Sequence, residues 1–205
     1  MSSQPSTGTG ELSAAERAFY SRQLILPEMG YEAQLALKRA RVVVLGAGGL
    51  GAPALLYLAG AGVGQIVVVD DDVVDASNLH RQVIHTHARV GNSKAESAAE
   101  SLRSLNPFIE VVPVCERLTE VNVDELLSGA DLVLDGSDNF ESRYVVSAAA
   151  ARAGIAHVWA AILGFDFAYW YCLLAIEGLA RIKIGFVVLV RIFFEYSRNI
   201  PNDIA

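Results

Sequence analysis

The stretch RVVVLGAGGLGAPALLYLAGAGVGQIVVVD, Arg41 to Asp70, decides the fold. It opens with an apolar run, Val42 to Leu45, as expected of a parallel strand that is buried on both faces. A glycine-rich turn follows, and then an apolar segment, Leu50 to Gly62, with the length of a crossover helix. A second apolar run, Ile66 to Val69, ends in an aspartate. This order predicts one βαβ unit of a doubly wound α/β fold.

The turn reads Gly46-Ala-Gly48-Gly49-Leu-Gly51 and matches the G-x-G-x-x-G fingerprint of dinucleotide-binding folds. In this fingerprint the first glycine allows a tight turn and the second lets the backbone approach a phosphate. The third lets the helix pack closely on the strand, and the helix N-terminus presents N–H groups to an anion. Asp70 ends the second strand, where a carboxylate can accept hydrogen bonds from ribose hydroxyls. The sequence therefore predicts an adenine-nucleotide site.

The residues outside the turn favour ATP over NAD. The turn is not a Walker A loop, because Ala52 and Pro53 stand where that loop requires Lys and Ser/Thr, so ATP would need cations from elsewhere. Arg81 and Lys94 can supply them, and Asp138 is an oxygen ligand suited to Mg²⁺. No lysine follows a tyrosine at the spacing of four residues that short-chain dehydrogenases use. Taken singly, the three residues could be a loop salt bridge, a surface cation and a turn former, but their joint occurrence favours a phosphate site.

The rest of the chain alternates between helical and strand patterns. Helices are predicted over 13–23, 31–39, 94–105, 122–125 and 140–153, and strands over 109–114, 131–135 and 156–162. This alternation predicts a Rossmann-like, mostly parallel sheet preceded by N-terminal helices. We expect a disordered lead-in over residues 1–12, a nucleotide-binding domain over 13–166, and an apolar tail of uncertain fold over 167–205.

Composition excludes several classes of protein. A net charge of −7 gives no sign of the basic face that binds nucleic acid. Cys115 and Cys172 form no Cys-x-x-Cys pair, so they predict neither a zinc site nor a disulfide framework. The longest uncharged run of the tail, 167–176, is short of the ~18 residues of a membrane span, and we do not expect the Ser/Gly/Thr-rich N-terminus to be a signal peptide. We expect a cytoplasmic enzyme that binds neither nucleic acid nor membrane.

Three histidines, His80, His85 and His87, lie close together in one predicted loop. Their spacing, with no cysteine to complete a ligand set, gives little support to a metal site. We interpret them as ordinary loop histidines.

Five segments resemble, in this order, the MoeB/ThiF family of bacterial relatives of the ubiquitin-activating enzymes. They are SRQLILPEMG, GAGGLG, VVDDDVVDASNLHRQ, VGNSKAESA and LVLDGSDNFESRY, and the resemblance extends over about residues 17–166. The molybdopterin-synthase adenylyltransferases are the nearest likeness within this family. Such enzymes use ATP to adenylate the C-terminal glycine carboxylate of a ubiquitin-like sulfur-carrier protein and release pyrophosphate. The resemblance therefore implies ATP and Mg²⁺ as ligands and a sulfur carrier as partner.

The resemblance also implies roles for individual residues. Gly48 and Gly49 would contact the nucleotide, with Gly46 and Gly51 shaping the turn, and Asp70 would bind the ribose. Ser77, Asn78, Arg81 and Lys94 would contact the nucleotide and its phosphates, and Asp138 would hold Mg²⁺ with Asn139 beside it. Arg22 corresponds to a family arginine that reaches the nucleotide of the partner subunit, which implies a homodimer. The expected catalytic residues are Arg22, Arg81, Lys94 and Asp138.

The family pattern ends after Asp166. Relatives continue with further strands and with two Cys-x-x-Cys pairs that hold zinc; this sequence has no such pair, so we expect the family zinc site to be absent from it. The unfamiliar tail is interpreted as a frameshifted or truncated end, or as a divergent ending that packs on the sheet. Two alternatives to an adenylyltransferase stay open: a non-catalytic ATP- or carrier-binding remnant of the family and, with less support, an NAD-dependent oxidoreductase.

Overall fold

The computed structural model describes residues 10–137, 140–163 and 166–172. The chain divides into two compact units. One unit, residues 38–176, contains the sheet. The described part of the other unit that precedes it in the chain, residues 10–37, is helical.

The N-terminal helices are α1 (Ala14–Phe19), α2 (Ser21–Leu24) and α3 (Gly30–Arg39). Helix α1 begins with a capping box, because Ser13 Oγ accepts from the Glu16 N–H and the Glu16 carboxylate accepts from the Ser13 N–H. Leu12 falls in the expected disordered lead-in, yet it is 1% exposed and its N–H donates to the Tyr31 hydroxyl. The ordered helical unit therefore begins before Ser13.

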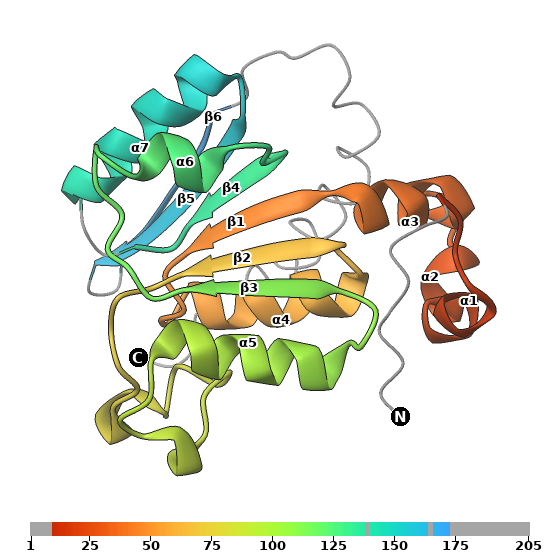
Figure 1. The fold of residues 1–205 in the computed structure, drawn as a ribbon, viewed down its shortest axis with the longest axis horizontal. Helices are drawn as coiled ribbons and strands as arrows, with labels where there is room; N and C mark the ends of the chain where they lie inside the picture. Colours follow the sequence, from red (N-terminus) through yellow and green to blue (C-terminus); the bar gives the residue numbers. More distant parts are fainter. Residues whose placement is uncertain (1–9, 138–139, 164–165, 173–205) are drawn as a thin grey trace. The chain divides into compact units, whose positions relative to one another are not determined.

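The second unit is built on a six-stranded sheet in the order β3-β2-β1-β4-β5-β6 (Figure 1). The strands are β1 (Arg41–Leu45), β2 (Gln65–Val69), β3 (Glu110–Val114), β4 (Leu132–Asp135), β5 (Ala156–Leu163) and β6 (Asp166–Cys172). The first five are parallel and β6 pairs antiparallel with β5. The predicted Rossmann-like, mostly parallel α/β fold is confirmed. Strand β6 carries the sheet past the expected domain boundary at residue 166.

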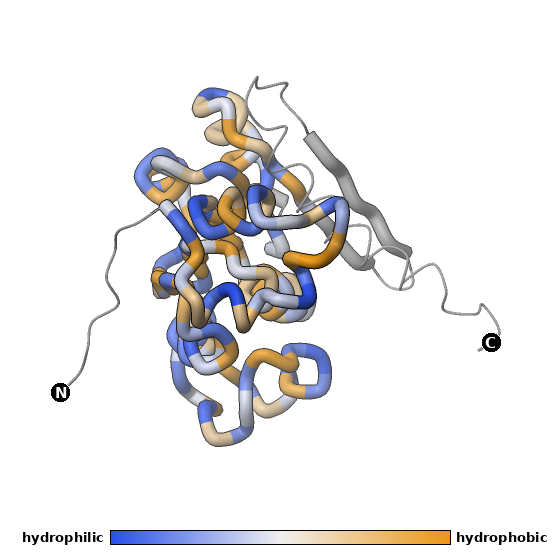
Figure 2. Tube along the Cα trace, turned by 90° about the vertical axis from the view of Figure 1, so that its right-hand side faces the viewer, coloured by the Kyte–Doolittle hydropathy of each residue, from blue (hydrophilic) through white to orange (hydrophobic). Residues whose placement is uncertain are grey.

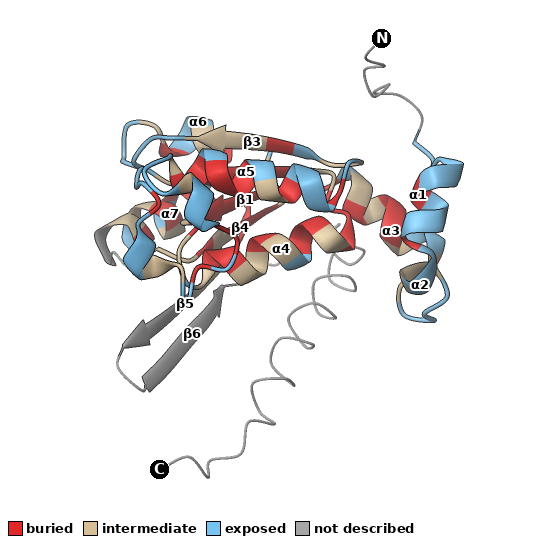
Figure 3. Cartoon of the chain, turned by 90° about the horizontal axis from the view of Figure 1, so that it is seen from below, coloured by how far each residue is buried: buried red, intermediate tan, exposed pale blue. Residues whose placement is uncertain are grey.

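Helices cover both faces of the sheet, as two-sided burial of β1 and β2 requires (Figures 1 and 3). Helices α4 (Gly51–Ala61) and α5 (Lys94–Leu105) lie on one face. Helices α6 (Val123–Leu127) and α7 (Phe140–Ala153) lie on the other, where residues such as Val43, Val67, Val133 and Val146 form one apolar cluster. Alternate strand residues point to opposite faces, so Val42 and Val44 are buried toward α4 and α5.

A long loop between β2 and α5 contains two short 3₁₀ turns, η1 (Ala76–Asn78) and η2 (His87–Arg89). Hydrophilic and hydrophobic residues follow one another along this loop, at the bottom of Figure 2. Val74 and Ile84 are fully buried and hold the loop against the unit, while Val73 forms an isolated bridge with Ser93. The loop therefore has a fixed course at the carboxyl end of the sheet, the edge at which α/β proteins place their ligands.

Candidate functional site

The glycine turn joins β1 to α4 and brings their backbones into close contact. Gly46 has φ +84, a left-handed conformation that a side chain would strain. A Cβ on Gly51 would lie 1.7 Å from the Gly46 carbonyl oxygen, so only glycine allows α4 to start where it does. The segment after β4 also lies against this turn, because a Cβ on Gly46 would be 3.2 Å from the Gly136 carbonyl oxygen. The turn therefore has little room for substitution at its first and last positions.

Asp70 follows β2 and is tied to the turn. Its carboxylate accepts hydrogen bonds from the N–H of Ala47, at 2.7 Å, and from the N–H of Asp72, at 2.9 Å. Burial raises the pKa of Asp70, and the two backbone hydrogen bonds and the charge of Lys94 oppose that rise. Each carboxylate oxygen has a second lone pair, so Asp70 can still accept hydrogen bonds from a ligand.

Lys94 is the first residue of α5, and its side chain is only 8% exposed. Its ammonium Nζ lies 2.7 Å from the Asp72 carboxylate, and its backbone N–H donates to the Asp72 carbonyl. The alternative reading of Lys94 as a surface cation is therefore wrong. The Asp72 side chain is 69% exposed, so the ion pair is open to solvent on the carboxylate side and an anionic ligand can compete for the lysine.

Arg81 lies beside the turn although many residues separate the two in sequence. A Cβ on Gly49 would lie 3.8 Å from Arg81 Cδ. The exposed guanidinium donates to Asn78 Oδ1 at 2.5 Å, an amide oxygen rather than the carboxylate of a loop salt bridge. Ser77 is occupied locally: its N–H and its hydroxyl both donate to Asp75, and these bonds lower the pKa of Asp75. Arg81 is thus the loop cation that the fold brings to the turn.

The structure does not place three of the expected site residues at the glycine turn. Asp138 and Asn139 lie outside the described residues. Arg22 is an exposed residue of α2, in the helical unit. Within the described parts of the chain, no group of three His, Cys, Asp or Glu side chains could hold a metal ion.

Sequence reasoning missed two buried side chains at the turn, His85 and Gln82. His85 is 5% exposed, and its ring nitrogens lie 3.0 Å from the Ala47 carbonyl and 2.9 Å from Ser97 Oγ. The interpretation of His85 as an ordinary loop residue is therefore wrong. Gln82 is 4% exposed, and its amide nitrogen lies 3.6 Å from where a Cβ of Gly48 would be. Their loop positions gave no signal of burial, because no regular period runs through this loop.

A second buried polar cluster supports the segment that leads to residue 138. Asp135 ends β4, and its carboxylate accepts from the N–H and the hydroxyl of Ser137. Arg143 Nε and His157 Nε2 lie 3.9 and 3.6 Å from its other oxygen. Arg143 donates to the Ser137 carbonyl, and its guanidinium lies 4.4 Å from the ring centre of Trp159. Ser137 is thus held from both sides.

A hollow of about 520 Å³ between α6 and α7 lies at the opposite edge of the sheet, where the strands begin. Its charged lining residues, Asp124 and Arg152, form an exposed ion pair with each other at 2.8 Å. The described site residues of the sheet unit lie at the carboxyl edge instead.

Among the described residues, no helix is both long and apolar enough to cross a membrane.

Comparison with known proteins identifies the family. The sequence profile of the ThiF family matches residues 20–172. The chain belongs to the ThiF family. All described site residues, from Arg22 to Lys94, fall within the matched range.

Curated relatives of this ThiF-family chain include "Probable adenylyltransferase/sulfurtransferase MoeZ" of Mycobacterium tuberculosis, 56% identical over 76% of this chain and 40% of the relative. "SAMP-activating enzyme E1" of Haloferax volcanii is 51% identical over 77% of this chain and 58% of the relative. "Sulfur carrier protein adenylyltransferase" of Thermus thermophilus is 52% identical over 72% and 54%. The chain thus spans about half the length of these relatives.

Solved structures share the fold of this ThiF-family chain. The E. coli tRNA N6-threonylcarbamoyladenosine dehydratase TcdA, in complex with ATP, matches with a TM-score of 0.68 and 32% identity, over 72% of this chain and 60% of that one. E. coli MccB, solved with AMPCPP and MccA, matches with a TM-score of 0.66 and 26% identity, over 83% of this chain and 52% of that one.

Proposed function

We propose that this chain catalyses ATP-dependent adenylation of the C-terminal glycine carboxylate of a ubiquitin-like sulfur-carrier protein, for molybdopterin or related sulfur-transfer biosynthesis in the cytoplasm. The observation that carries this proposal is that Arg81 lies against a glycine turn that has no lysine of its own, while the buried Lys94 pairs with Asp72, whose N–H donates to the Asp70 carboxylate that is bonded to the turn. The bacterial relatives, which include a sulfur carrier protein adenylyltransferase, support the same chemistry. The ATP complex of TcdA supports ATP as the nucleotide.

The reaction needs no general base, because a carboxylate is already ionised at neutral pH. A carboxylate oxygen of the carrier attacks the α-phosphorus of ATP, forming an O–P bond. The bond from that phosphorus to the bridging oxygen breaks, and pyrophosphate leaves with the electron pair. Catalysis then depends on holding the two reactants in line and on stabilising negative charge.

Each site residue has a role in this proposal. The turn from Gly46 to Gly51 receives the nucleotide and Asp70 accepts from the ribose hydroxyls. Arg81 can bind phosphate oxygens through a directional fork, whereas Lys94 acts as a point charge. Lys94 exchanges the Asp72 carboxylate for a phosphate when ATP binds, because both anions compete for the same ammonium.

The proposal includes Mg²⁺, which Asp138 would hold, with Asn139 beside it. When bound, Mg²⁺ would supply positive charge that offsets the negative charge of the phosphates. Ser77 and Asn78 are proposed to contact the nucleotide from η1. Arg22 is proposed to act across the interface of a homodimer.

Exchange of labelled pyrophosphate into ATP tests the proposal, with a ubiquitin-like sulfur-carrier protein as the second substrate. We expect carrier-dependent exchange by the wild type and a loss of roughly 100-fold or more in Lys94→Ala, from the removal of one charge-stabilising group. Lys38→Ala, which removes a lysine in α3, is the matched control and retains exchange. Unimpaired exchange in Lys94→Ala would remove that residue from the mechanism.

Titrations with ATP and NAD separate the alternatives. Binding of ATP without exchange would indicate a non-catalytic remnant of the family. A preference for NAD would overturn the proposal, because it would make the glycine turn a dehydrogenase cofactor site.

A further inference from the structure

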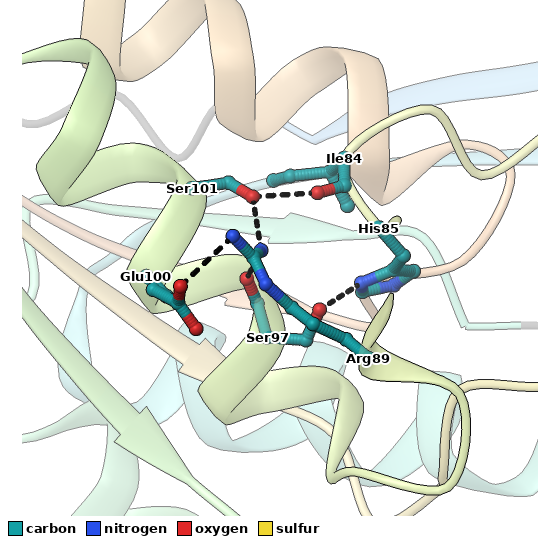
Figure 4. A network of polar contacts seen from close by, with 6 residues as sticks. All are labelled: Ile84, His85, Arg89, Ser97, Glu100 and Ser101. Carbon is teal, nitrogen blue, oxygen red and sulfur yellow. Dashed lines mark hydrogen bonds and ion pairs between the residues drawn. The ribbon is translucent and has the colours of Figure 1, made fainter. Parts of the chain in front are cut away.

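His85 links the glycine turn to helix α5. Its ring lies between the Ala47 carbonyl on one side and Ser97 Oγ on the other, at 3.0 and 2.9 Å. Figure 4 shows the ring directed toward Ser97 from the loop that also carries Ile84 and Arg89. His85 is therefore a buried group that the proposed chemistry does not use, in direct contact with the turn that would receive the nucleotide.

The two partners of His85 fix its tautomer. A carbonyl oxygen can only accept, so Nε2 must carry the proton that is donated to Ala47. In a neutral ring Nδ1 is then an acceptor, and the Ser97 hydroxyl donates to it. Burial and the nearby charges of Lys94 and Arg89 lower the pKa of His85, against the opposing effects of the Ala47 carbonyl and Asp70. The neutral Nε2–H form is the one that the surroundings favour.

The hydrogen bond from His85 fixes one peptide plane of the turn. In a trans peptide the C=O of Ala47 and the N–H of Gly48 point in opposite directions. The Ala47 N–H is held separately by Asp70. Because glycine tolerates many backbone conformations, this peptide could rotate if nothing held its carbonyl. With His85 in place, the Gly48 N–H points away from the ring.

His85 is itself anchored to α5 by its neighbours. The Ile84 carbonyl accepts from Ser101 Oγ, and Arg89 donates to the Ser97 carbonyl and to Ser101 Oγ (Figure 4). Arg89 also pairs with Glu100 at 3.1 Å. These bonds attach the loop to α5, whose first residue is Lys94.

We propose that His85 is a positioning residue that orients the Ala47–Gly48 peptide so that the Gly48 N–H faces the phosphates of bound ATP. This inference rests on the proposed function. A peptide turned the other way would present the Ala47 carbonyl oxygen to the phosphates, and two electron-rich groups would then face each other. His85 does not touch the nucleotide.

Two substitutions separate the hydrogen bonds of His85. An asparagine amide occupies the place of Nδ1 and loses the bond to Ala47, whereas a glutamine amide places a donor near Nε2 and can keep it. We expect His85→Asn to weaken ATP binding roughly five- to tenfold in calorimetric titrations, the worth of one hydrogen bond. We expect the ATP affinity of His85→Gln to stay within about twofold of that of the wild type, because the hydrogen bond to Ala47 is kept. Ser97→Ala, which removes the other hydrogen bond of the ring, is the control, and its ATP affinity should also stay within about twofold of that of the wild type.

Long-range proton–nitrogen NMR spectra of the ligand-free wild type provide a readout that a general loss of packing would not move. We expect the Nε2–H tautomer for His85, and a shift of the Gly48 amide signal in His85→Asn that His85→Gln largely reverses. An Nδ1–H tautomer, or equal ATP affinity in His85→Asn and wild type, would overturn the inference. Failure of the wild type to bind ATP would instead overturn the proposed function, since the tautomer is measured without nucleotide.

Discussion

At the scale of single residues, His85 makes stability depend on pH. Its pKa in the folded chain is below the ordinary value of 6.5, mainly because of burial and then because of Lys94 and Arg89. The unfolded chain therefore takes up a proton first as the pH falls, so this contribution to stability is present above about pH 6.5 and lost on acidification. The raised pKa of Asp70 acts in the opposite sense over its own range.

Comparison of wild type with His85→Gln isolates this contribution, because other groups titrate in both proteins. Urea unfolding at about pH 7.5 and about pH 5.5 should show a larger loss of the free energy of unfolding in the wild type than in the variant. Equal losses in the two proteins would show that His85 does not titrate differently on folding.

The residues of the site differ in how far the sequence could predict them. Gly46, Gly51 and Asp70 follow from a fixed spacing after a buried strand, because the βαβ unit itself sets their positions. The burial of Lys94 and His85 depends on how a loop packs on α5, and a loop has no period from which packing can be predicted. For the same reason Asp72, the present partner of Lys94, gave no signal.

At the scale of elements, the start of helix α4 depends on Gly51. A methyl group there would lie 1.7 Å from the Gly46 carbonyl oxygen, a backbone atom that cannot move without displacing the turn. Gly51→Ala should therefore lose several kcal/mol of the free energy of unfolding, of the order found for overpacked cores and strained backbones. Thermal and urea unfolding measure this.

Gly60, in the same helix, is the matched control. A Cβ there would meet nothing within 4 Å, and the residue is helical. Gly60→Ala should stabilise the chain by about 0.5–1 kcal/mol, because alanine loses less backbone entropy on folding. A destabilisation of Gly51→Ala no larger than the change in Gly60→Ala would show that α4 can shift on β1.

Helix α7 is fixed to the sheet by Arg143. The side chains of Arg143 and Asp135 are 6% and 0% exposed, so removal of the arginine leaves a buried carboxylate with His157 as its remaining basic neighbour. Arg143→Met should cost about 3 kcal/mol of the free energy of unfolding. Arg152 is also in α7 and forms an exposed ion pair with Asp124 of α6. Arg152→Met should therefore cost about 0.5 kcal/mol or less of the free energy of unfolding. Similar losses in the two variants in urea unfolding would contradict the assigned role of the buried pair.

Most elements of the sheet unit could be predicted because each strand is a short apolar run, the glycine turn marks the start of α4, and α5 has an amphipathic pattern. Strand β6 could not, because the run FAYWYC is apolar throughout and has no alternation or turn signal to separate a strand from a helix. Its pairing with β5 depends on tertiary contacts, which a local sequence pattern does not predict. The tail after residue 172 lies outside the described residues, so the interpretations of that tail stay predictions.

At the scale of the whole molecule, the proposed site takes residues from two chains. The helical unit holds Arg22 and the sheet unit holds Lys94, and the proposed homodimer would join them across subunits. Symmetry then makes two equivalent sites, each with Lys94 from one subunit and Arg22 from the other. An arginine supplied in this way would stabilise charge on the phosphates without belonging to the subunit that binds them.

Mixing of two inactive variants tests this arrangement. Arg22→Ala and Lys94→Ala should each abolish carrier-dependent pyrophosphate exchange. After subunits exchange at random, about half of the dimers are mixed, and each mixed dimer has one site with both residues intact. The mixture should therefore recover about a quarter of wild-type activity. No recovery, with mixed dimers demonstrated by mass spectrometry of differently tagged chains, would show that Arg22 acts within its own subunit.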